Sequence, residues 1–162
     1  MDWQALFNMQ KQLDSYIEEN HGLEKADLFE KKILALLVEL GELANETRCF
    51  KFWSKKPRNK QSVILEEYVD VIHFLMSVGI NKGYDSFEST NDQHINRSEI
   101  DQFQIVYEQT IMYKNEPIKA KYEELFSSCI DLGNILGFSE EDIQRAYLEK
   151  NEINYKRQNQ GY

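Results

Sequence analysis

Residues 62–81, SVILEEYVDVIHFLMSVGIN, restrict the fold of this chain more than any other segment. Wound as a helix, the segment is apolar on two sides, formed by Leu65, Val69, Ile72 and Met76 and by Val63, Phe74 and Val78. A helix that is apolar nearly all round is stable only when other elements bury both of its sides. We therefore predict a helical bundle that encloses this segment.

The rest of the chain supplies further helices for such a bundle. The expected helices are residues 2–20, 26–48, 62–81, 99–114, 117–136 and 139–150. We find no convincing run of strand alternation, and only 7 glycines and 2 prolines interrupt the 162 residues. These features predict one all-α domain over residues 1–162, with connecting segments at 51–61 and 84–98 and a polar, basic tail at 150–162.

Acidic residues border the apolar faces of the second and third predicted helices. Glu39 and Glu42 fall in a stripe directly beside the leucines of the second helix. Glu67 and Asp70 lie on an apolar side of the third helix. Burying bare carboxylates costs much free energy unless a cation or hydrogen bonds compensate them. We therefore expect these four acids to have a partner of opposite charge.

The spacing of the acids indicates a metal site. Glu39 and Glu42 are three residues apart, as are Glu67 and Asp70, so each pair projects from neighbouring turns of one helix. Antiparallel packing of the two helices would bring four carboxylates to one point. Oxygen ligands in that number suit Mg²⁺, two or more ions for each site, with Mn²⁺ as an alternative. The simpler interpretation is that the acids are solvated or paired with lysines.

Two other classes of protein stay open at this point. A di-iron carboxylate bundle uses Glu-x-x-His pairs on two helices, and this sequence has none, although Asp70-x-x-His73 is close to that pattern. A non-catalytic helical interaction module would carry the same acids for structural reasons. That class predicts that no property of the protein depends on Mg²⁺.

Charge and cysteine content bear on the binding partners and the cellular compartment of the protein. With 28 acidic and 19 basic residues, the formal net charge is −9, which argues against non-specific binding of nucleic acid because such binding neutralises phosphates. Cys49 and Cys129 fit no metal-binding spacing, and we expect reduced thiols in a cytoplasmic protein. We expect neither a signal peptide nor a membrane span, because the sequence lacks apolar runs of the required kind.

Several stretches, together with the two acid pairs, resemble the dimeric dUTPase family, which belongs with MazG-type enzymes to the all-α nucleoside triphosphate pyrophosphatases. These stretches are MQKQLD (9–14), FKFWSKKP (50–57), DVIHF (70–74) and KNEINYKRQNQGY (150–162). The tail is the most specific of them, because residues of that type have no obvious folding role. The resemblance implies an all-α bundle and a homodimer with sites near the subunit interface.

The resemblance also implies a reaction, the hydrolysis of dUTP, and also of dUDP, to dUMP. Glu39, Glu42, Glu67 and Asp70 would hold Mg²⁺, which neutralises the phosphates and acidifies water. Glu39 is the first choice for the carboxylate that deprotonates the attacking water, with Glu42 second.

The remaining site residues fall into two groups. For base and sugar we expect Gln10, Asp14, Trp53, His73 and Phe74, and for phosphate Lys51, Lys55, Lys150, Asn151, Asn154, Arg157 and Tyr162. Glutamine offers both a donor and an acceptor to uracil, tryptophan can stack on the base, and lysine and arginine supply charge to phosphate. The alternatives are an exposed helical glutamine, a half-buried tryptophan, a histidine satisfied in the core, a solvated basic loop and a frayed tail.

The sequence departs from the family at one position of the first helix, and a long stretch of it shows no resemblance to the family. Asp14 stands where some relatives have asparagine, and residues 84–135 carry no family signal. Members of the family differ in the pyrimidine nucleotides that they accept. A broader dNTP pyrophosphohydrolase of the same fold, acting on dCTP or on modified nucleotides, is therefore the main alternative to a dUTPase.

Overall fold

The chain is described by a computed structural model over residues 1–88 and 96–162, and all regular structure in these ranges is helical. The helices are α1 (Trp3–Asn20), α2 (Phe29–Thr47), α3 (Gln61–Asn81), α4 (Glu99–Asn115), α5 (Lys119–Ile135) and α6 (Glu140–Asn159). The prediction of an all-α bundle is confirmed, and the expected helices agree with α1 to α5 to within three residues at each end. Of the expected connector at 84–98, residues 89–95 lie outside the described residues.

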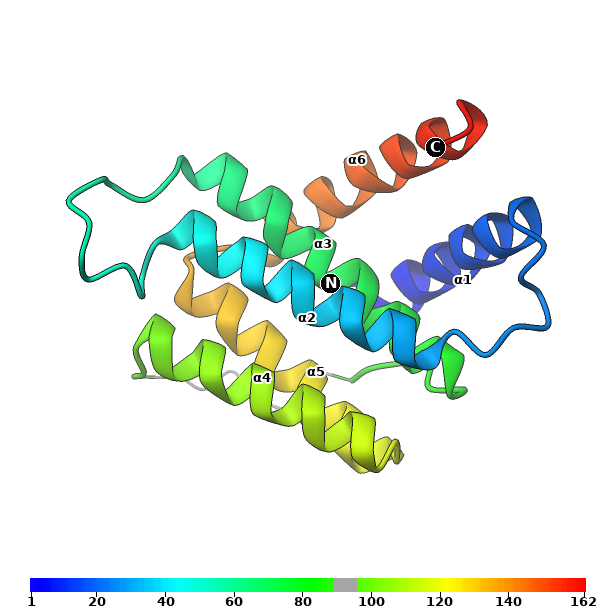
Figure 1. Ribbon diagram of the computed structural model, residues 1–162, viewed down its shortest axis with the longest axis horizontal. Helices are drawn as coiled ribbons and strands as arrows, with labels where there is room; N and C mark the ends of the chain where they lie inside the picture. Colours follow the sequence, from blue (N-terminus) through cyan, green and yellow to red (C-terminus); the bar gives the residue numbers. More distant parts are fainter. Residues whose placement is uncertain (89–95) are drawn as a thin grey trace.

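Helix α3 occupies the middle of the bundle, as its apolar surface predicts. It packs against α2, α6, α1 and α5 (Figure 1), and α2 is its most extensive neighbour. Its fully buried residues include Ile64, Val69, Ile72, Leu75, Met76 and Val78, which point in several directions around the helix. The helix that carries Glu67 and Asp70 is therefore held by neighbours on more than one side.

Two reciprocal tyrosine–glycine contacts fix α3 against α5. The ring of Tyr122 lies on Gly79, where an added Cβ would come within 2.1 Å of the ring, and the ring of Tyr68 lies on Gly133 in the same way, at 2.4 Å. Each hydroxyl donates to a backbone carbonyl one turn before the glycine, Tyr122 to Leu75 at 3.0 Å and Tyr68 to Cys129 at 2.9 Å. Because only glycine leaves room for these rings, the two helices approach closely.

The outer part of the bundle is a helical hairpin of α4 and α5. Helix α4 lies on α2 (Figure 1), where the hydroxyl of Tyr107 donates to the carbonyl of Leu37 at 3.1 Å. Buried side chains from both helices of the hairpin, among them Phe103, Val106, Tyr113 and Leu125, join the core cluster. None of the described helices is both long and apolar enough to cross a membrane.

Helix α6 is longer than the sequence predicted. It begins with a capping box of Ser139 and Asp142, but it continues to Asn159 and so includes most of the segment expected to be an irregular tail. The extension is stabilised by packing on α1, because the rings of Tyr155 and Tyr16 lie 5.2 Å apart and Tyr16 also hydrogen-bonds to Asn159. The basic tail is therefore a helical arm laid beside α1.

Candidate active site

The packing of α2 on α3 brings three of the four predicted acids together. One carboxylate oxygen from each of Glu39, Glu67 and Asp70 lies within 4.8 Å of the others. Glu42 is exposed and does not belong to this group, although its charge acts on Glu39. The arrangement is an acid cluster on two buried helices, as the spacing predicted, with Glu42 at its edge.

The charge of the acid cluster is only partly compensated by the protein. Burial, followed by the charges of Asp70 and Glu42, raises the pKa of Glu39 to about 7. Burial also raises the pKa of Glu67 and of Asp70. A group of three partly buried carboxylates with one lysine nearby keeps an excess of negative charge, which fits a hard divalent cation such as Mg²⁺. Glu39, Glu67 and Asp70 would hold such an ion, with Glu42 within reach of a second.

One lysine supplies part of the missing charge. The Nζ of Lys150, on α6, lies 2.7 Å from Oδ2 of Asp70 and 3.2 Å from Oε1 of Glu66. Burial alone would lower the pKa of Lys150, but the hydrogen bonds and charges of these two acids raise it overall, so the side chain is an ammonium ion. The lysine predicted to bind phosphate therefore lies against Asp70 of the acid cluster and against the neighbouring Glu66.

A cavity of about 270 Å³ lies beside the acid cluster, between α1, α3 and α6. Its lining includes most of the residues predicted from the sequence: Gln10, Asp14, Glu39, Asp70, His73, Phe74, Asn154, Arg157 and Tyr162. Glu39 and Asp70 belong both to this lining and to the acid cluster. Residues far apart in the sequence that were predicted to bind metal and nucleoside therefore line one cavity.

A buried hydrogen-bond network forms one wall of the cavity. Oε1 of Gln10 lies 2.6 Å from Nδ1 of His73 and accepts a hydrogen bond from the hydroxyl of Tyr147 at 2.9 Å. The rings of His73 and Tyr147 stack at 4.2 Å. Burial, and the nearby charge of Lys150, lower the pKa of His73 to about 3, so the imidazole is neutral at physiological pH.

Asp14 anchors the same network on α1. Its carboxylate accepts from Nε2 of Gln10 at 2.8 Å, from the hydroxyl of Ser77 at 2.6 Å and from Nζ of Lys32 at 3.2 Å. Lys32 also pairs with Glu18 at 3.0 Å. Asp14 is thus a partnered carboxylate in the cavity lining, and the lysine balances its charge.

Three residues of this network were missed in the sequence, yet each stands at helical spacing from a residue that was found. Lys32 is two turns before Glu39, Ser77 is one turn after His73, and Tyr147 is one turn before Asn151. Extending each predicted stripe by one or two turns would have located them. Gln158, which also lines the cavity, follows Asn154 by one turn.

The C-terminal arm contributes one side of the cavity lining. Asn154, Arg157, Gln158 and Tyr162 line it, and the guanidinium of Arg157 lies 5.5 Å from the centre of the Tyr162 ring. Asn151 is buried deeper, and its Nδ2 has no hydrogen-bond partner among residues 1–88 and 96–162. Four of the five tail residues predicted to bind phosphate, Lys150 among them, thus lie at the acid cluster or the cavity.

The arrangement of acid cluster, cavity and arm can be compared with known families. A family model described as dUTPase matches residues 2–162. The chain belongs to the dimeric all-α dUTPase family. This membership supports a dUTP diphosphatase-type function, that is, a nucleotide pyrophosphohydrolase. A comparison with curated proteins gave no significant match.

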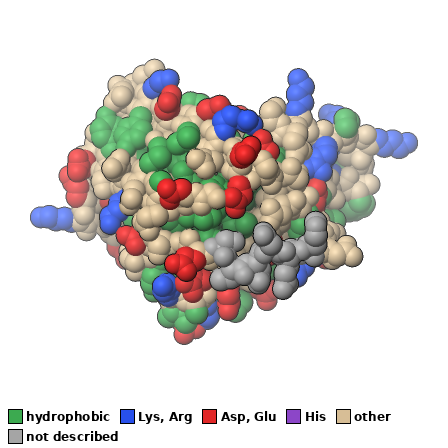
Figure 2. All heavy atoms as spheres, turned by 180° about the vertical axis from the view of Figure 1, so that it is seen from behind, with side chains coloured by type: hydrophobic (Ala, Val, Ile, Leu, Met, Phe, Trp, Pro, Cys, Tyr) green, Lys and Arg blue, Asp and Glu red, His purple; other side chains and the backbone are tan. Residues whose placement is uncertain are grey.

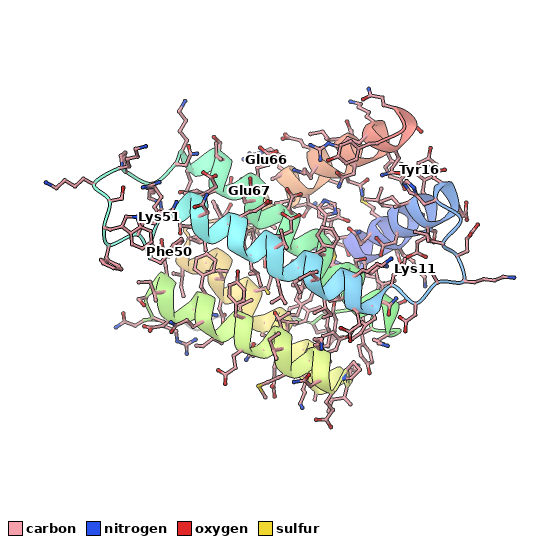
Figure 3. All side chains as sticks on the ribbon, viewed as in Figure 1. Lys11, Tyr16, Phe50, Lys51, Glu66 and Glu67 are labelled. Carbon is pink, nitrogen blue, oxygen red and sulfur yellow. The ribbon has the colours of Figure 1, made fainter. Side chains whose placement is uncertain are left out.

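One part of the dUTPase signature lies apart from the cavity of its own chain. Trp53, Lys51 and Lys55 are on the loop between α2 and α3 and are not among the cavity lining. Figure 3 shows Phe50 and Lys51 beyond the ends of α2 and α3, whereas Tyr16, which marks the α1 side, lies at the opposite end of the molecule. The ring of Trp53 is largely exposed, and its ring-to-ring contacts with residues that the structure describes are to Phe50 and Phe52 of the same loop.

The loop is nevertheless well anchored. The side chain of Arg48 donates to the hydroxyl of Ser54 at 2.7 Å and to the carbonyl of Lys56 at 3.2 Å. Nδ2 of Asn59 donates to Glu46 at 2.6 Å, and Lys51 hydrogen-bonds to Asn45. These bonds hold the exposed aromatic and basic side chains on an ordered projection from the bundle.

Proposed function

We propose that this protein hydrolyses dUTP, and also dUDP, to dUMP with Mg²⁺ held by Glu39, Glu42, Glu67 and Asp70. One observation carries the proposal: Glu39 and Asp70 line the nucleoside-facing cavity and also belong to the acid cluster. A nucleotide in that cavity would have its phosphates beside the acids. Family membership supports the same class of reaction.

Glu39 is the proposed general base. When bound, Mg²⁺ supplies positive charge that neutralises the phosphates and acidifies water. Glu39 accepts the proton of the attacking water, and its pKa of about 7 in the metal-free protein suits a base that works near neutral pH. Glu42 is the second candidate, because it is exposed and its charge acts on Glu39. Glu67 and Asp70 are the proposed ligands of Mg²⁺ and do not accept the proton of the attacking water.

The nucleoside contacts follow from the cavity wall. Gln10 and His73 line the cavity together with the apolar side chains of Phe74 and Leu13, which is the composition expected of a small-molecule pocket. Asn154 and Arg157 on α6 supply a donor and a bidentate cation for the phosphates. Lys150, Asn151 and Tyr162 complete the proposed phosphate contacts.

We propose a homodimer in which the loop at 48–60 completes the site of the partner subunit. The loop is ordered, carries Trp53, Lys51 and Lys55, and lies away from the cavity of its own chain. Two large apolar side chains of α2, Leu34 and Val38, are 61% and 50% exposed, as suits a face that a second copy covers. Trp53 would then stack on the base in the partner's cavity, and the two lysines would reach its phosphates.

Nucleic acid is not the proposed partner. Figure 2 shows acidic side chains scattered over the face turned away in Figure 1, with the basic side chains mostly at the rim. The formal net charge of −9 opposes a phosphate backbone as well.

Nucleotide hydrolysis by the purified protein tests the proposal. dUTP, dUDP, dCTP, dTTP and dATP are each incubated with Mg²⁺, with Mn²⁺ and with a chelator, and the release of monophosphate, pyrophosphate and phosphate is measured. We expect dUMP from dUTP and dUDP only when a divalent cation is present. Comparable release from dCTP favours the broader pyrophosphohydrolase. Absence of release from every nucleotide contradicts both and favours the interaction module.

A further inference from the structure

The carboxylate of Asp14 determines which way the amide of Gln10 faces. A carboxylate only accepts hydrogen bonds, so the group of Gln10 that lies 2.8 Å from Oδ1 of Asp14 is the NH₂. The other oxygen of Asp14 is already engaged by the hydroxyl of Ser77 and by Lys32. The side chains of Asp14 and Lys32 are only 11% and 13% exposed, so water does not readily replace these partners.

The orientation of Gln10 in turn determines the tautomer of His73. With its NH₂ on Asp14, Gln10 turns Oε1 to Nδ1 of His73 at 2.6 Å and to the hydroxyl of Tyr147. An oxygen that faces Nδ1 requires a proton on that nitrogen. The neutral imidazole therefore carries its proton on Nδ1 and has a lone pair on Nε2. Nε2 is buried and has no partner among the described residues.

We propose that Asp14 is a positioning residue, which through Gln10 fixes the tautomer of His73 and so makes Nε2 an acceptor for a hydrogen of the bound nucleoside. The inference rests on the proposed function, because His73 lines the same cavity. Two hydrogens of a deoxyuridine nucleotide qualify, the 3′-hydroxyl of the sugar and N3–H of uracil. An acceptor at this place favours uracil over cytosine if it meets N3, because cytosine has no hydrogen there.

The variant Asp14→Asn should reverse the hydrogen-bond directions from residue 14 through Gln10 to His73 and leave the side chains in place. We call this chain of hydrogen bonds the relay. Lys32 and Ser77 donate to the inner oxygen of residue 14, so the introduced amide keeps its oxygen on that side and turns its NH₂ to Gln10. Gln10 must then turn its own oxygen to residue 14 and its NH₂ to His73. Nδ1 becomes the acceptor, and the proton moves to Nε2. Lys32 keeps its pair with Glu18, so no buried cation loses all its partners.

NMR of the histidine ring nitrogens tests the relay without any turnover. The chain has 3 histidines, and the His73 signals are assigned by their loss in His73→Gln. We expect the proton on Nδ1 in the wild type and on Nε2 in Asp14→Asn. The control Ser77→Ala removes a donor to Asp14 but leaves the carboxylate, so its His73 should stay protonated on Nδ1. A wild-type proton on Nε2, or the same tautomer in wild type and Asp14→Asn, overturns the proposal.

A double variant provides a rescue. In Asp14→Asn combined with Gln10→Glu, the new carboxylate accepts from the introduced amide and from Nδ1 of His73 together. We expect the proton to return to Nδ1 in this double variant. Failure to return while the circular dichroism spectrum stays native would show that the tautomer does not depend on the Gln10 side chain, which also overturns the proposal.

Binding of dUMP, measured by calorimetry, connects the tautomer to the ligand. If N3–H of uracil is the donor, we expect Asp14→Asn to weaken dUMP binding by roughly ten- to a hundredfold, because two donors then face each other. If the 3′-hydroxyl is the partner, we expect a smaller loss, because a hydroxyl can turn to accept from Nε2–H. If the sugar supplies the hydrogen, wild type should bind 2′,3′-dideoxy-UMP weakly and the substitution should affect that ligand little; if uracil supplies it, the N3-methyl analogue behaves this way. An equal loss for all three ligands overturns the proposal. Failure of wild type to bind dUMP refutes the proposed function and leaves the NMR result standing.

Discussion

The ammonium of Lys150 lies 2.7 Å from Oδ2 of Asp70, so a cation of the protein itself contacts one of the acids proposed to hold metal. The side chain of Lys150 is 8% exposed, and burial of both partners makes the contact hard for solvent to replace. A lysine and a divalent ion at one carboxylate compete for the same negative charge. If the acid cluster holds a divalent ion as proposed, we expect metal binding and the position of α6 to be coupled.

Substitution of Lys150 should reveal this competition. We expect Lys150→Gln to raise the affinity of the nucleotide-free protein for Mn²⁺ by roughly fivefold, which corresponds to about 1 kcal/mol of competing attraction. Calorimetric titration with Mn²⁺ at pH 8 measures it. Lys156→Gln is the matched control, because Lys156 is on the same helix, is 71% exposed and makes only a long ion pair of 4.0 Å with Glu152. An affinity for Mn²⁺ equal to or weaker than that of the wild type contradicts the competition.

Removal of the proposed base should affect catalysis far more than folding. We expect Glu39→Gln to reduce kcat for dUTP by about 10²- to 10⁴-fold, because the carboxylate that accepts the proton of water is lost. Steady-state kinetics in excess Mg²⁺ measure the loss, and thermal melting checks the fold. Glu46→Gln, on the same helix but outside the acid cluster, should keep most of its turnover. If Glu39→Gln were equally active, neither the base nor the metal assignment would stand.

The same carboxylate predicts how stability depends on pH in the absence of metal. Folding raises the pKa of Glu39 from 4.5 to about 7, so the folded state holds this proton more tightly than the unfolded chain. The free energy of unfolding therefore falls as pH rises from about 4.5 to about 7, because the folded protein must ionise a carboxylate that burial and neighbours disfavour. The variant Glu39→Gln has no carboxylate to ionise at this position, so it does not lose this stability. In the presence of chelator, its Tm should therefore exceed that of the wild type by a margin that grows between pH 5 and pH 8.

Mg²⁺ should reverse that advantage. A bound cation favours the ionised carboxylate, so at pH 8 and saturating Mg²⁺ the wild type should gain more in Tm than Glu39→Gln. Differential scanning calorimetry at both pH values, with and without Mg²⁺, gives the four comparisons. A Tm difference that is the same under all four conditions would mean that Glu39 titrates as an ordinary surface acid.

Mixed dimers test whether the loop acts on the partner subunit. Glu39→Gln and Trp53→Ala each damage a different part of the proposed site, so each homodimer should be impaired. In the mixed dimer, one site combines an intact Glu39 with an intact Trp53 from the partner. We expect the activity of the mixture, after subunit exchange, to exceed that of both variants alone.

The control for this experiment combines both substitutions in one chain. Mixing that double variant with the wild type should leave no fully intact site in the mixed dimer, because each site would lack either Glu39 or the partner's Trp53. If each loop served its own subunit, the mixture of the two single variants would be no more active than either variant alone, whereas every wild-type subunit would keep its activity in the mixture with the double variant. A monomer in analytical ultracentrifugation would exclude the arrangement altogether.

Much of the fold follows from local sequence signals. The apolar surface of α3 predicts that it is buried on several sides, and the spacing of Glu39, Glu67 and Asp70 predicts that they meet. These features depend on helix geometry alone, which sequence periodicity reports directly. The motif at 150–162 likewise points to the arm that lines the cavity.

Other features depend on tertiary contacts that periodicity does not report. The extension of α6 to Asn159 depends on the contact between Tyr155 and Tyr16, which are distant in sequence. The position of Lys150 depends on Glu66 and Asp70 of α3, with which it forms ion pairs. The role of Asp14 depends on Lys32 from another helix, because only a partnered carboxylate is stable in that place.

The paired tyrosine–glycine contacts of α3 and α5 also bear on how this chain can change in length. Tyr68 and Gly79 on α3 are separated by the same number of residues as Tyr122 and Gly133 on α5, so the two contacts match across antiparallel helices. One residue inserted between either pair would turn part of that helix by about 100° and separate a ring from its glycine. Natural insertions and deletions should therefore be confined to the connections and to the ends of the helices, and the spacing of the acids along α3 is protected from drift by the same constraint.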